Sequence, residues 1–468
     1  MAVRFSDDQI AKATGAHRVR IGSRASYDSV CTDTRALKPG ALFVALKGER
    51  FDAHEFLFQA GESGAAGVVV QAGHPYKMPS PEVAVYEVPD TLVALGALAH
   101  AHRLRFKHPV GAVTGSNGKT TTKELLGAIL ETRGPALKTK GNLNNEVGVP
   151  LTLFELTPQH VAAAVEMGMN HPGEISRLVA IAKPDAALIT IVQPAHLEHL
   201  GSIDGVAKAK GEIFEGLEPG ATAVVNLDDA RIVAQAERCK PGVKKLTFGR
   251  AAGADVHLAK VEPRGRSGLS LTVRCAGKEY PVALHLIGEH NANNATGAFA
   301  LAVALGYSPE ECVRGLEAAQ AHSRRLQLVD APGGVTVIDD CYNANPASMS
   351  AALDALTTLA AKGRPVAVLG DMLELGPGEL QEHEQLGVKA AGHAKLLGFF
   401  GPRSKAGWAQ AVKRLGMSAQ HFEDIDALNA WLKSQLKDGD WVLVKGSRGM
   451  KLERVVEALT GKSGGGGH

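Results

Sequence analysis

The chain has 468 residues, too many for one hydrophobic core of ordinary size, so we predict about three domains. Hydrophobic residues make up 45% of the chain and charged residues 21%, which excludes an intrinsically disordered protein. The formal net charge of +2 excludes a broad basic field, so we expect no nucleic-acid partner and recognition of substrate charge by local groups.

The five cysteines are scattered without C-x-x-C spacing, which favours a reducing cytoplasm over a disulfide scaffold or a zinc site. The opening MAVRFSDDQI lacks the pattern of a secretion signal. Apolar runs such as AFALAVAL reach about half of the roughly 20 residues that a membrane span requires. We therefore predict a cytoplasmic protein with no membrane span, and interpret residues 463–468 as a tag remnant.

Residues 1–108 carry short β patterns, ALFVAL, GVVV and VAVYEV, between loops rich in Gly, Pro and Asp, and predict a small α/β domain. Residues 109–320 alternate strand and helix patterns, which predicts a parallel sheet covered by helices. The segment VHLAKVEPRGRSGLSLTVRCAGKEYPVALHLIG interrupts them, and we expect added antiparallel hairpins that turn at Gly265, Gly268 and Gly277.

Residues 321–462 repeat strand and helix and predict a second, Rossmann-like doubly wound sheet. Ligands of open α/β sheets bind at the carboxyl ends of strands. Such ends are marked here by TGSNGKT, EMGMN, NLDD, IDDCYNANP and LGDMLELG. We expect them to face one cleft, with hinges near residues 108 and 321.

The stretch AVTGSNGKTTTKELLG, residues 112–127, reads as strand, glycine loop and helix. Gly115 and Gly118 allow backbone N–H groups to approach an anion, and a helix N-terminus favours negative charge. Lys119 can then reach terminal phosphates, and the Thr120 hydroxyl can reach a bound Mg²⁺. The alternative is a glycine-rich turn with an incidental lysine. The order of the elements favours a nucleotide loop.

Further residues with metal-compatible chemistry follow other strands. Glu166 ends the strand of AVEMGMN, and with Thr120 it offers the oxygen ligands that Mg²⁺ prefers. His196 follows the strand AALITIV, and Lys208 and Lys210 lie on a predicted helix. Taken singly, these residues are also compatible with an exposed carboxylate, a packed histidine and a solvated basic face.

The segments TGSNGKTTTK, GNLNNEVGVPLTL, EMGMNHPGEI, AHLEHLGS, AKAKGEIF, GEHNANNATGA, SRRLQ, DDCYNANPASM and LGDMLELG resemble, in this order, the ATP-dependent Mur ligases. The resemblance covers nearly the whole chain. Its N-terminal stretch CTDTRALKPGALFVALKGERFDAHEF is similar to the uridine-diphosphate-binding domain of the later-acting members. The resemblance implies a ligase of peptidoglycan precursor synthesis with three domains. The first would bind a nucleotide-sugar, the second would bind ATP, and the third would be the ligase domain that closes over the second.

The resemblance also implies the chemistry. A carboxylate of UDP-N-acetylmuramoyl-tripeptide would be activated by ATP as an acyl phosphate, and the amine of D-alanyl-D-alanine would displace phosphate. Lys119 would cover the β and γ phosphates. Thr120 and Glu166 would hold one Mg²⁺, while His196 and a carbamylated Lys210 would hold a second. Lys210 is preferred to Lys208 because it begins the KGEIF segment.

Other roles follow from the same resemblance. Asn291 would approach adenine, and Arg325 and Asp340 would close over the ribose and phosphates when the third domain swings inward. We expect a monomer, and the third residue of the acceptor peptide stays open. The ATP-binding residues would be Gly115, Ser116, Asn117, Gly118, Lys119, Thr120, Thr121, Asn291, Arg325 and Asp340. The nucleotide-sugar and dipeptide would contact Thr34, Arg35, Asn144, Asn145, Asn343, Asn345 and Arg448.

Three rival interpretations stay open. A folylpolyglutamate-type ligase shares the phosphate loop but does not need the N-terminal nucleotide-sugar domain. A P-loop switch protein would hydrolyse ATP without an amine acceptor. A non-catalytic nucleotide-sugar-binding module would not require Lys119, Glu166 and His196 together.

Overall fold

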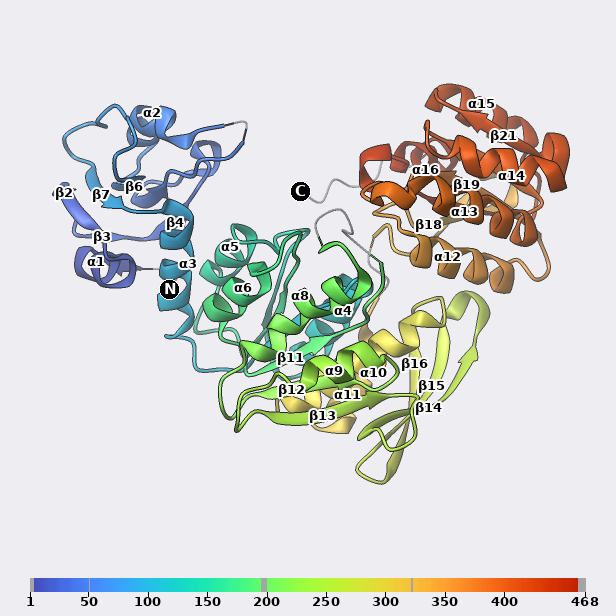
Figure 1. Ribbon diagram of the computed structural model, residues 1–468, viewed down its shortest axis with the longest axis horizontal. Helices are drawn as coiled ribbons and strands as arrows, with labels where there is room; N and C mark the ends of the chain where they lie inside the picture. The colour runs from blue at the N-terminus through green and yellow to red at the C-terminus, as the bar shows by residue number, and fades with distance from the viewer. Residues whose placement is uncertain (1–3, 50, 195–199, 321–322, 462–468) are drawn as a thin grey trace.

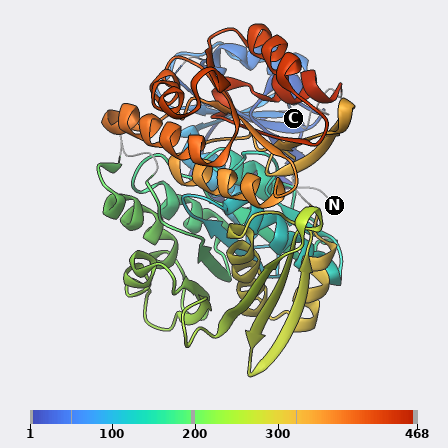
Figure 2. The same ribbon diagram turned by 90° about the vertical axis from the view of Figure 1, so that its right-hand side faces the viewer.

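The computed structural model describes residues 4–49, 51–194, 200–320 and 323–461. These residues form three α/β domains, a central one with the N-terminal and C-terminal domains on either side of it (Figure 1). Each domain is built on its own sheet, of five, nine and six strands in chain order, and a two-stranded ribbon accompanies the first. A view from the side places the C-terminal domain over the central one (Figure 2). The predicted fold class of three α/β domains is confirmed.

The N-terminal sheet has the strand order β2-β7-β6-β5-β4, in which β2 is antiparallel and the other strands are parallel. Its central strands are almost fully buried, because each carries a run of apolar residues that helices and loops cover on both faces. The elements are β1 Phe5–Ser6, α1 Asp7–Thr14, β2 His17–Arg20, β3 Ser26–Tyr27, β4 Ser29–Cys31, η1 Thr34–Ala36, β5 Ala41–Val44, η2 Ala53–Phe56, α2 Leu57–Glu62, β6 Gly67–Gln71, β7 Ala84–Val88 and α3 Thr91–Arg103.

Helix α3 joins the first two domains through a shared core. It packs against α1 on one side and against α5 and α6 of the central domain on the other. The buried Arg103 donates from Nε to the Ala182 carbonyl at 2.9 Å and forms an ion pair with Asp185 at 3.0 Å. The Asp185 carboxylate also accepts the Val110 N–H at 2.8 Å, at the start of the central sheet. These contacts hold the expected hinge region near residue 108 against the central domain.

The central sheet has the order β16-β15-β14-β13-β12-β11-β8-β10-β9. Its strands from β8 to β14 pair in parallel, and β14, β15 and β16 are antiparallel hairpin strands that extend the same sheet, turning where the sequence predicted. The elements are β8 Val110–Thr114, α4 Lys119–Leu130, η3 Glu131–Arg133, β9 Ala136–Lys138, α5 Gly148–Phe154, β10 Ala162–Glu166, α6 Glu174–Ala182, β11 Ala186–Ile189, α8 Ile203–Glu215, β12 Thr222–Asn226, α9 Ala230–Ala236, β13 Lys244–Gly249, β14 Val256–Pro263, η4 Gly265–Ser267, β15 Leu269–Cys275, β16 Lys278–Leu284, α10 His290–Ala304 and α11 Pro309–Ala318.

Alternation along the central strands produces two cores. Ala112 of β8 faces the core shared with α3, α5, α6 and α8, whereas the next residue, Val113, faces the core under α4, α10 and α11. Ala163 and Ala164 of β10 divide in the same way. Small residues on these strands let the helices approach closely, so the strand ends and their loops are held rigidly.

The C-terminal sheet has the order β17-β18-β22-β19-β20-β21, with β17 antiparallel and the rest parallel. Helices cover both faces, as in a doubly wound sheet. The elements are β17 Gln327–Ala331, η5 Pro332–Gly334, β18 Val335–Asp339, α12 Pro346–Leu359, β19 Arg364–Gly370, η6 Gly376–Gly378, α13 Glu379–His393, β20 Leu396–Phe400, α14 Lys405–Leu415, η7 Gly416–Ser418, β21 Ala419–Phe422, α15 Ile425–Gln435, β22 Asp440–Lys445, η8 Arg448–Met450 and α16 Glu453–Thr460.

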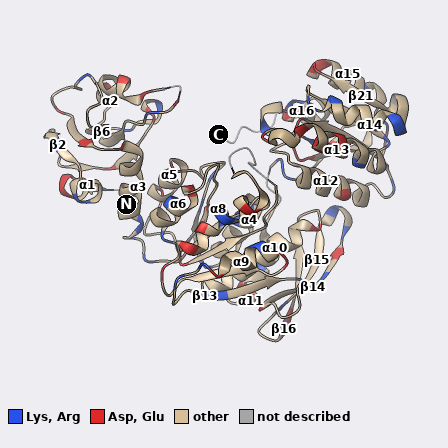
Figure 3. Cartoon of the chain, viewed as in Figure 1, with Lys and Arg blue, Asp and Glu red and all other residues tan. Residues whose placement is uncertain are grey.

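Charged residues of both signs are interspersed over all three domains (Figure 3). In the described part of the chain, no helix has the length and apolar composition to cross a membrane. The proposed tag remnant, residues 463–468, lies outside the described residues. The charges that matter for a ligand are therefore those at individual strand ends.

Candidate functional site

A cleft of about 350 Å³ lies between the central and C-terminal domains, at the carboxyl ends of β8, β10 and β18. It brings together most of the predicted ATP-site residues with side chains that the sequence interpretation did not single out, among them Gln193, Asn294, Tyr342 and Lys445. The predicted residues that line it are Ser116, Asn117, Gly118, Lys119, Thr120, Thr121, Asn144, Glu166, Asn291, Arg325, Asp340, Asn343 and Asn345.

The phosphate loop connects β8 to α4, and its two glycines have positive φ angles. Gly115 has a φ of +151° and Gly118 a φ of +79°. A Cβ on Gly115 would lie 1.8 Å from Thr190 Oγ1, and a Cβ on Gly118 would lie 2.3 Å from Asn294 Oδ1. The glycines are therefore required by neighbouring side chains as well as by backbone conformation, a reason that local sequence does not show.

Lys119 begins α4 and folds back over the loop. Its Nζ donates to the Gly115 carbonyl at 2.9 Å. Burial lowers the pKa of the Lys119 ammonium, Glu166 acts to raise it, and Arg325 lowers it further. The loop backbone and Lys119 thus form one donor-rich surface at a helix N-terminus, which suits an anion.

Glu166 ends β10 and is buried opposite this loop. Its Oε1 accepts from the Asn144 side-chain amide at 2.8 Å, whereas its buried Oε2 has no hydrogen-bond partner in the described part of the structure. A buried carboxylate oxygen without a partner is unfavourable unless a cation or donor meets it. The donor chemistry therefore fits a hard divalent cation.

Lys210 lies on α8 and is buried, in contrast to the exposed Lys208 two residues earlier. Burial lowers its pKa well below the ordinary value, and repulsion from the Lys119 ammonium adds to the decrease. Among the described residues it has no hydrogen-bond or ion-pair partner. His196, the other predicted ligand of the second metal, lies outside the described residues, between β11 and α8.

The C-terminal domain touches the phosphate loop directly. Arg325 donates from Nη2 to Thr120 Oγ1 at 2.9 Å, and its guanidinium lies 4.2 Å from the ring centroid of Tyr342. Asn345, the N-cap of α12, donates from Nδ2 to Asn117 Oδ1 at 2.7 Å. The Thr120 hydroxyl, predicted as a metal ligand, thus has a guanidinium as its partner in this structure.

Two further predicted residues lie at the mouth of the cleft. Asp340 forms an ion pair with the buried Lys445 at 2.8 Å, and Lys445 also donates to the Asn343 carbonyl at 2.9 Å. Asn291 is near the start of α10 and donates to the carbonyl of Ile287, which precedes the helix, at 2.7 Å, and it accepts from Asn294 of the same helix at 2.9 Å. Each group is therefore oriented by contacts within the protein.

The remaining predicted residues lie elsewhere. Asn145 Oδ1 accepts the Gly148 N–H at 2.8 Å at the start of α5, and Asn145 is not among the residues that line the cleft. Arg448 is exposed on η8, with its guanidinium 5.5 Å from the Tyr342 ring centroid. In the N-terminal domain, Thr34 and Arg35 lie on η1, and Arg35 is exposed and paired with Asp33.

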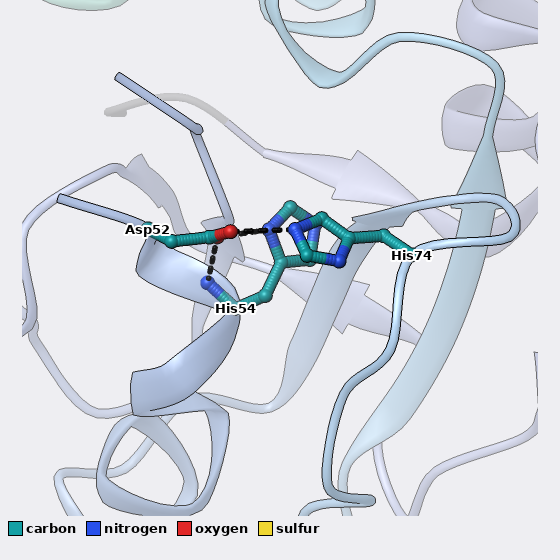
Figure 4. A group of neighbouring side chains, drawn as sticks. All are labelled: Asp52, His54 and His74. Carbon is teal, nitrogen blue, oxygen red and sulfur yellow. Dashed lines mark hydrogen bonds and ion pairs between the residues drawn. The ribbon is translucent and has the colours of Figure 1, made fainter. Parts of the chain in front are cut away.

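Asp52, His54 and His74 form a group where β5 and β6 end (Figure 4). The Gln71 N–H donates to His54 Nε2 at 3.0 Å, so the proton of His54 is on Nδ1, 2.7 Å from Asp52 Oδ1. Burial lowers the pKa of His54, which favours this neutral form.

A metal at Nδ1 of His54 would shift the ring proton to Nε2, against the Gln71 N–H. His74 Nε2 lies 2.5 Å from the second Asp52 oxygen. The group is therefore a hydrogen-bonded clasp between two loops of this edge, in which His54 does not ligate a metal.

Comparisons with known proteins agree with this geometry. The Mur ligase family catalytic domain matches residues 26–103, the Mur ligase middle domain residues 113–302, and the Mur ligase glutamate ligase domain residues 324–448. The UDP-N-acetylmuramoyl-tripeptide–D-alanyl-D-alanine ligase of Escherichia coli (strain K12) is 38% identical over 450 residues, which cover 94% of this chain and 95% of that protein.

Two solved structures share the whole domain arrangement. MurF from Acinetobacter baumannii has a TM-score of 0.90 at 35% identity, with 98% of this chain and 100% of that chain covered. The MurF ligase from Thermotoga maritima in complex with ADP has a TM-score of 0.81 at 28% identity, with 92% and 96% covered. The three domains, the phosphate loop facing a buried carboxylate, and these full-length matches lead to one conclusion: the chain belongs to the Mur ligase family.

Proposed function

We infer that this chain is an ATP-dependent ligase that joins the amine of D-alanyl-D-alanine to the terminal peptide carboxylate of UDP-N-acetylmuramoyl-tripeptide, releasing ADP and phosphate. The observation that carries the inference is the match of 38% identity along nearly the full length of a ligase with that name. The N-terminal domain is part of this match, which distinguishes the chain from a folylpolyglutamate-type ligase.

The reaction requires an activated carboxylate, because amide formation from a carboxylate and an amine in water is unfavourable. The carboxylate oxygen attacks the γ-phosphorus of ATP, ADP leaves, and an acyl phosphate forms. The amine then attacks the acyl carbon, phosphate leaves, and the amine loses a proton. Both reactants in the first step are anions, so cations fixed in advance lower its barrier. We assign Lys119 and Arg325 to this neutralisation, since both face the cleft from opposite domains.

We propose that Mg²⁺ binds at this site, a role that the orphaned Glu166 Oε2 supports. Thr120 and Glu166 would hold one ion, once Arg325 transfers from Thr120 to the phosphates. His196 and Lys210 would hold a second. Bound Mg²⁺ would supply positive charge that offsets the negative charge of the phosphates and of the attacking carboxylate.

We propose in addition that Lys210 is carbamylated. Its lowered pKa exposes a neutral amine, whose lone pair can attack CO₂; a C–N bond forms, a proton leaves to solvent, and an anionic carbamate results. The modification replaces a group that repels Mg²⁺ with an oxygen ligand that Mg²⁺ prefers. It also places a negative charge near the Lys119 ammonium.

The substrate contacts are proposals of the same kind. The nucleotide-sugar would bind at the edge formed by η1 and the clasp of Asp52, His54 and His74, where Thr34 and Arg35 offer a hydroxyl and a guanidinium. The dipeptide would bind on the C-terminal side of the cleft, near Asn144, Asn343 and Arg448. Asn345 would hold the C-terminal domain against the phosphate loop, and Asn145 would support the site by holding the start of α5. We propose a cytoplasmic monomer, because the reaction consumes ATP and all five cysteines are free.

Phosphate release tests the function directly. Purified protein, ATP, Mg²⁺ and UDP-N-acetylmuramoyl-tripeptide are combined with D-alanyl-D-alanine or with single amino acids. We expect release that depends on the dipeptide, with the UDP-muramoyl-pentapeptide as product. Release with single amino acids only would refute the specificity, and release without any amine would favour a P-loop switch.

A further inference from the structure

Lys123 is a buried cation that the mechanism above does not use. It lies on α4 one helical turn after Lys119, and its side chain is fully buried. Its ammonium forms an ion pair with Glu124 and donates to the Thr139 carbonyl at 2.7 Å. A lysine is almost never buried unless its charge is paired, and α4 could bury an apolar residue here instead. Its contact with Thr139 indicates a specific use for the charge.

Thr139 connects Lys123 to Glu166. The Thr139 N–H donates to the Ala164 carbonyl at 3.1 Å, and Thr139 Oγ1 accepts the Glu166 N–H at 3.0 Å. Thr139 directly follows β9, the edge strand beside β10. It is therefore held by α4 through its carbonyl and by β10 through its amide and hydroxyl.

The segment that begins at Thr139 also holds the Glu166 carboxylate. The Asn144 carbonyl accepts the Gly168 N–H at 2.8 Å, and the Asn144 amide donates to Glu166 Oε1 at 2.8 Å. A Cβ on Gly168 would lie 2.9 Å from the Asn144 side chain, so the two segments are in close contact. Both the backbone and the side chain of Glu166 are thus oriented from residues 139–144.

We propose that Lys123 is a positioning residue that, through Thr139, sets the direction of the free Glu166 Oε2 relative to the phosphate loop. Lys119, in the first turn of α4, folds over the phosphate loop, and Lys123 connects the next turn of the same helix to the segment behind Glu166. Because a helix turn is rigid, the position of the Lys119 ammonium is fixed relative to the position of the Glu166 carboxylate. The inference rests on the proposed role of Glu166 as a Mg²⁺ ligand.

Metal binding at equilibrium tests the proposal without turnover. Free Mn²⁺ is titrated by electron paramagnetic resonance against the full chain saturated with ADP. Thr139→Val removes the Oγ1 acceptor at nearly constant volume, Thr139→Ser retains it, and Lys123→Met removes the charge. Loss of an outer-shell partner weakens metal affinity by about 10- to 100-fold. We expect that loss for Thr139→Val and Lys123→Met, and wild-type affinity for Thr139→Ser.

Lys138→Met is the matched control. Lys138 directly precedes Thr139, and its Nζ lies 3.8 Å from the carboxylate of the same Glu124, but its side chain is partly exposed. It should retain wild-type Mn²⁺ affinity. Wild-type affinity in Thr139→Val or in a folded Lys123→Met, or equal losses in Lys138→Met, would overturn the proposal. If Lys123→Met does not fold in a melting experiment, Thr139→Val decides. Failure of the wild-type ADP complex to bind Mn²⁺ would instead overturn the metal role of Glu166.

Discussion

Replacing Lys210 with methionine should stabilise the protein while abolishing ligation. Lys210 is buried and unpaired among the described residues, and its pKa is lowered well below the ordinary value by burial. In the unfolded chain a lysine has a pKa of about 10.4, so a folded state that favours the neutral amine at pH 7 loses stability relative to the unfolded chain. Methionine has a similar volume and no charge. Replacement of a buried ion pair by apolar residues of similar volume is often neutral or stabilising by about 1 to 4 kcal/mol, and we expect a gain of that order for this unfavourably buried lysine.

The sign of the pH dependence follows from the direction of the shift. The unfolded chain binds more protons at this site than the folded chain, so the stability of the wild type rises with pH until the unfolded lysine titrates. The methionine variant lacks this term. The gain from Lys210→Met should therefore be larger at pH 7 than at pH 9, within the window between the lowered folded pKa and about 10.4.

Unfolding in denaturant, in CO₂-free buffer without nucleotide or metal, measures this gain. Lys208→Met is the matched control, because Lys208 is exposed on the same helix, and its stability should stay within about 0.5 kcal/mol of the wild type. Bicarbonate with Mg²⁺ should stabilise the wild type but not Lys210→Met. A loss of stability in Lys210→Met at pH 7, or a gain that grows toward pH 9, would refute the reasoning.

Three further predictions concern ligation. Lys210→Ala should lose most activity and recover part of it with added formate or acetate, which can occupy the carboxylate position; full activity without rescue would contradict the carbamate. Lys119→Ala should weaken ATP binding by about 1.5 to 3 kcal/mol, measured by calorimetry, and reduce turnover further; near-normal turnover would disprove its role. Asn345→Ser should retain the α12 cap and the melting temperature but lower kcat/KM, because the serine side chain is too short to reach Asn117, whereas Asn345→Ala should also lose about 1 kcal/mol of stability. Equal kcat/KM in Asn345→Ser and the wild type would show that this contact does not support closure.

The parts of this site that depend on neighbouring residues in the chain were predictable. A strand, a glycine loop and a helix that begins with lysine occur within residues 110–130, and their order alone indicates an anion site. The run of apolar strands likewise predicts which segments are buried. Of the polar strand ends expected to face one cleft, those after β8, β10, β12 and β18 line it, whereas the LGDMLELG segment after β19 does not. The added antiparallel hairpins with turns at Gly265, Gly268 and Gly277 also follow from local alternation, and they extend the central sheet.

By itself the sequence determined the three α/β domains, the phosphate loop and the membership of the chain in its family, because these are recorded in local periodicity and in motif order. Only the tertiary structure decided which residues that are distant in sequence contact each other at the site. Asn345 contacts Asn117 across 228 positions, which no local pattern encodes. The neighbouring Asn144 and Asn145 look alike in sequence, yet the first donates to the Glu166 carboxylate and the second accepts the Gly148 N–H at the start of α5. Packing made that division, because a one-residue step along the chain turns a side chain toward a different neighbour.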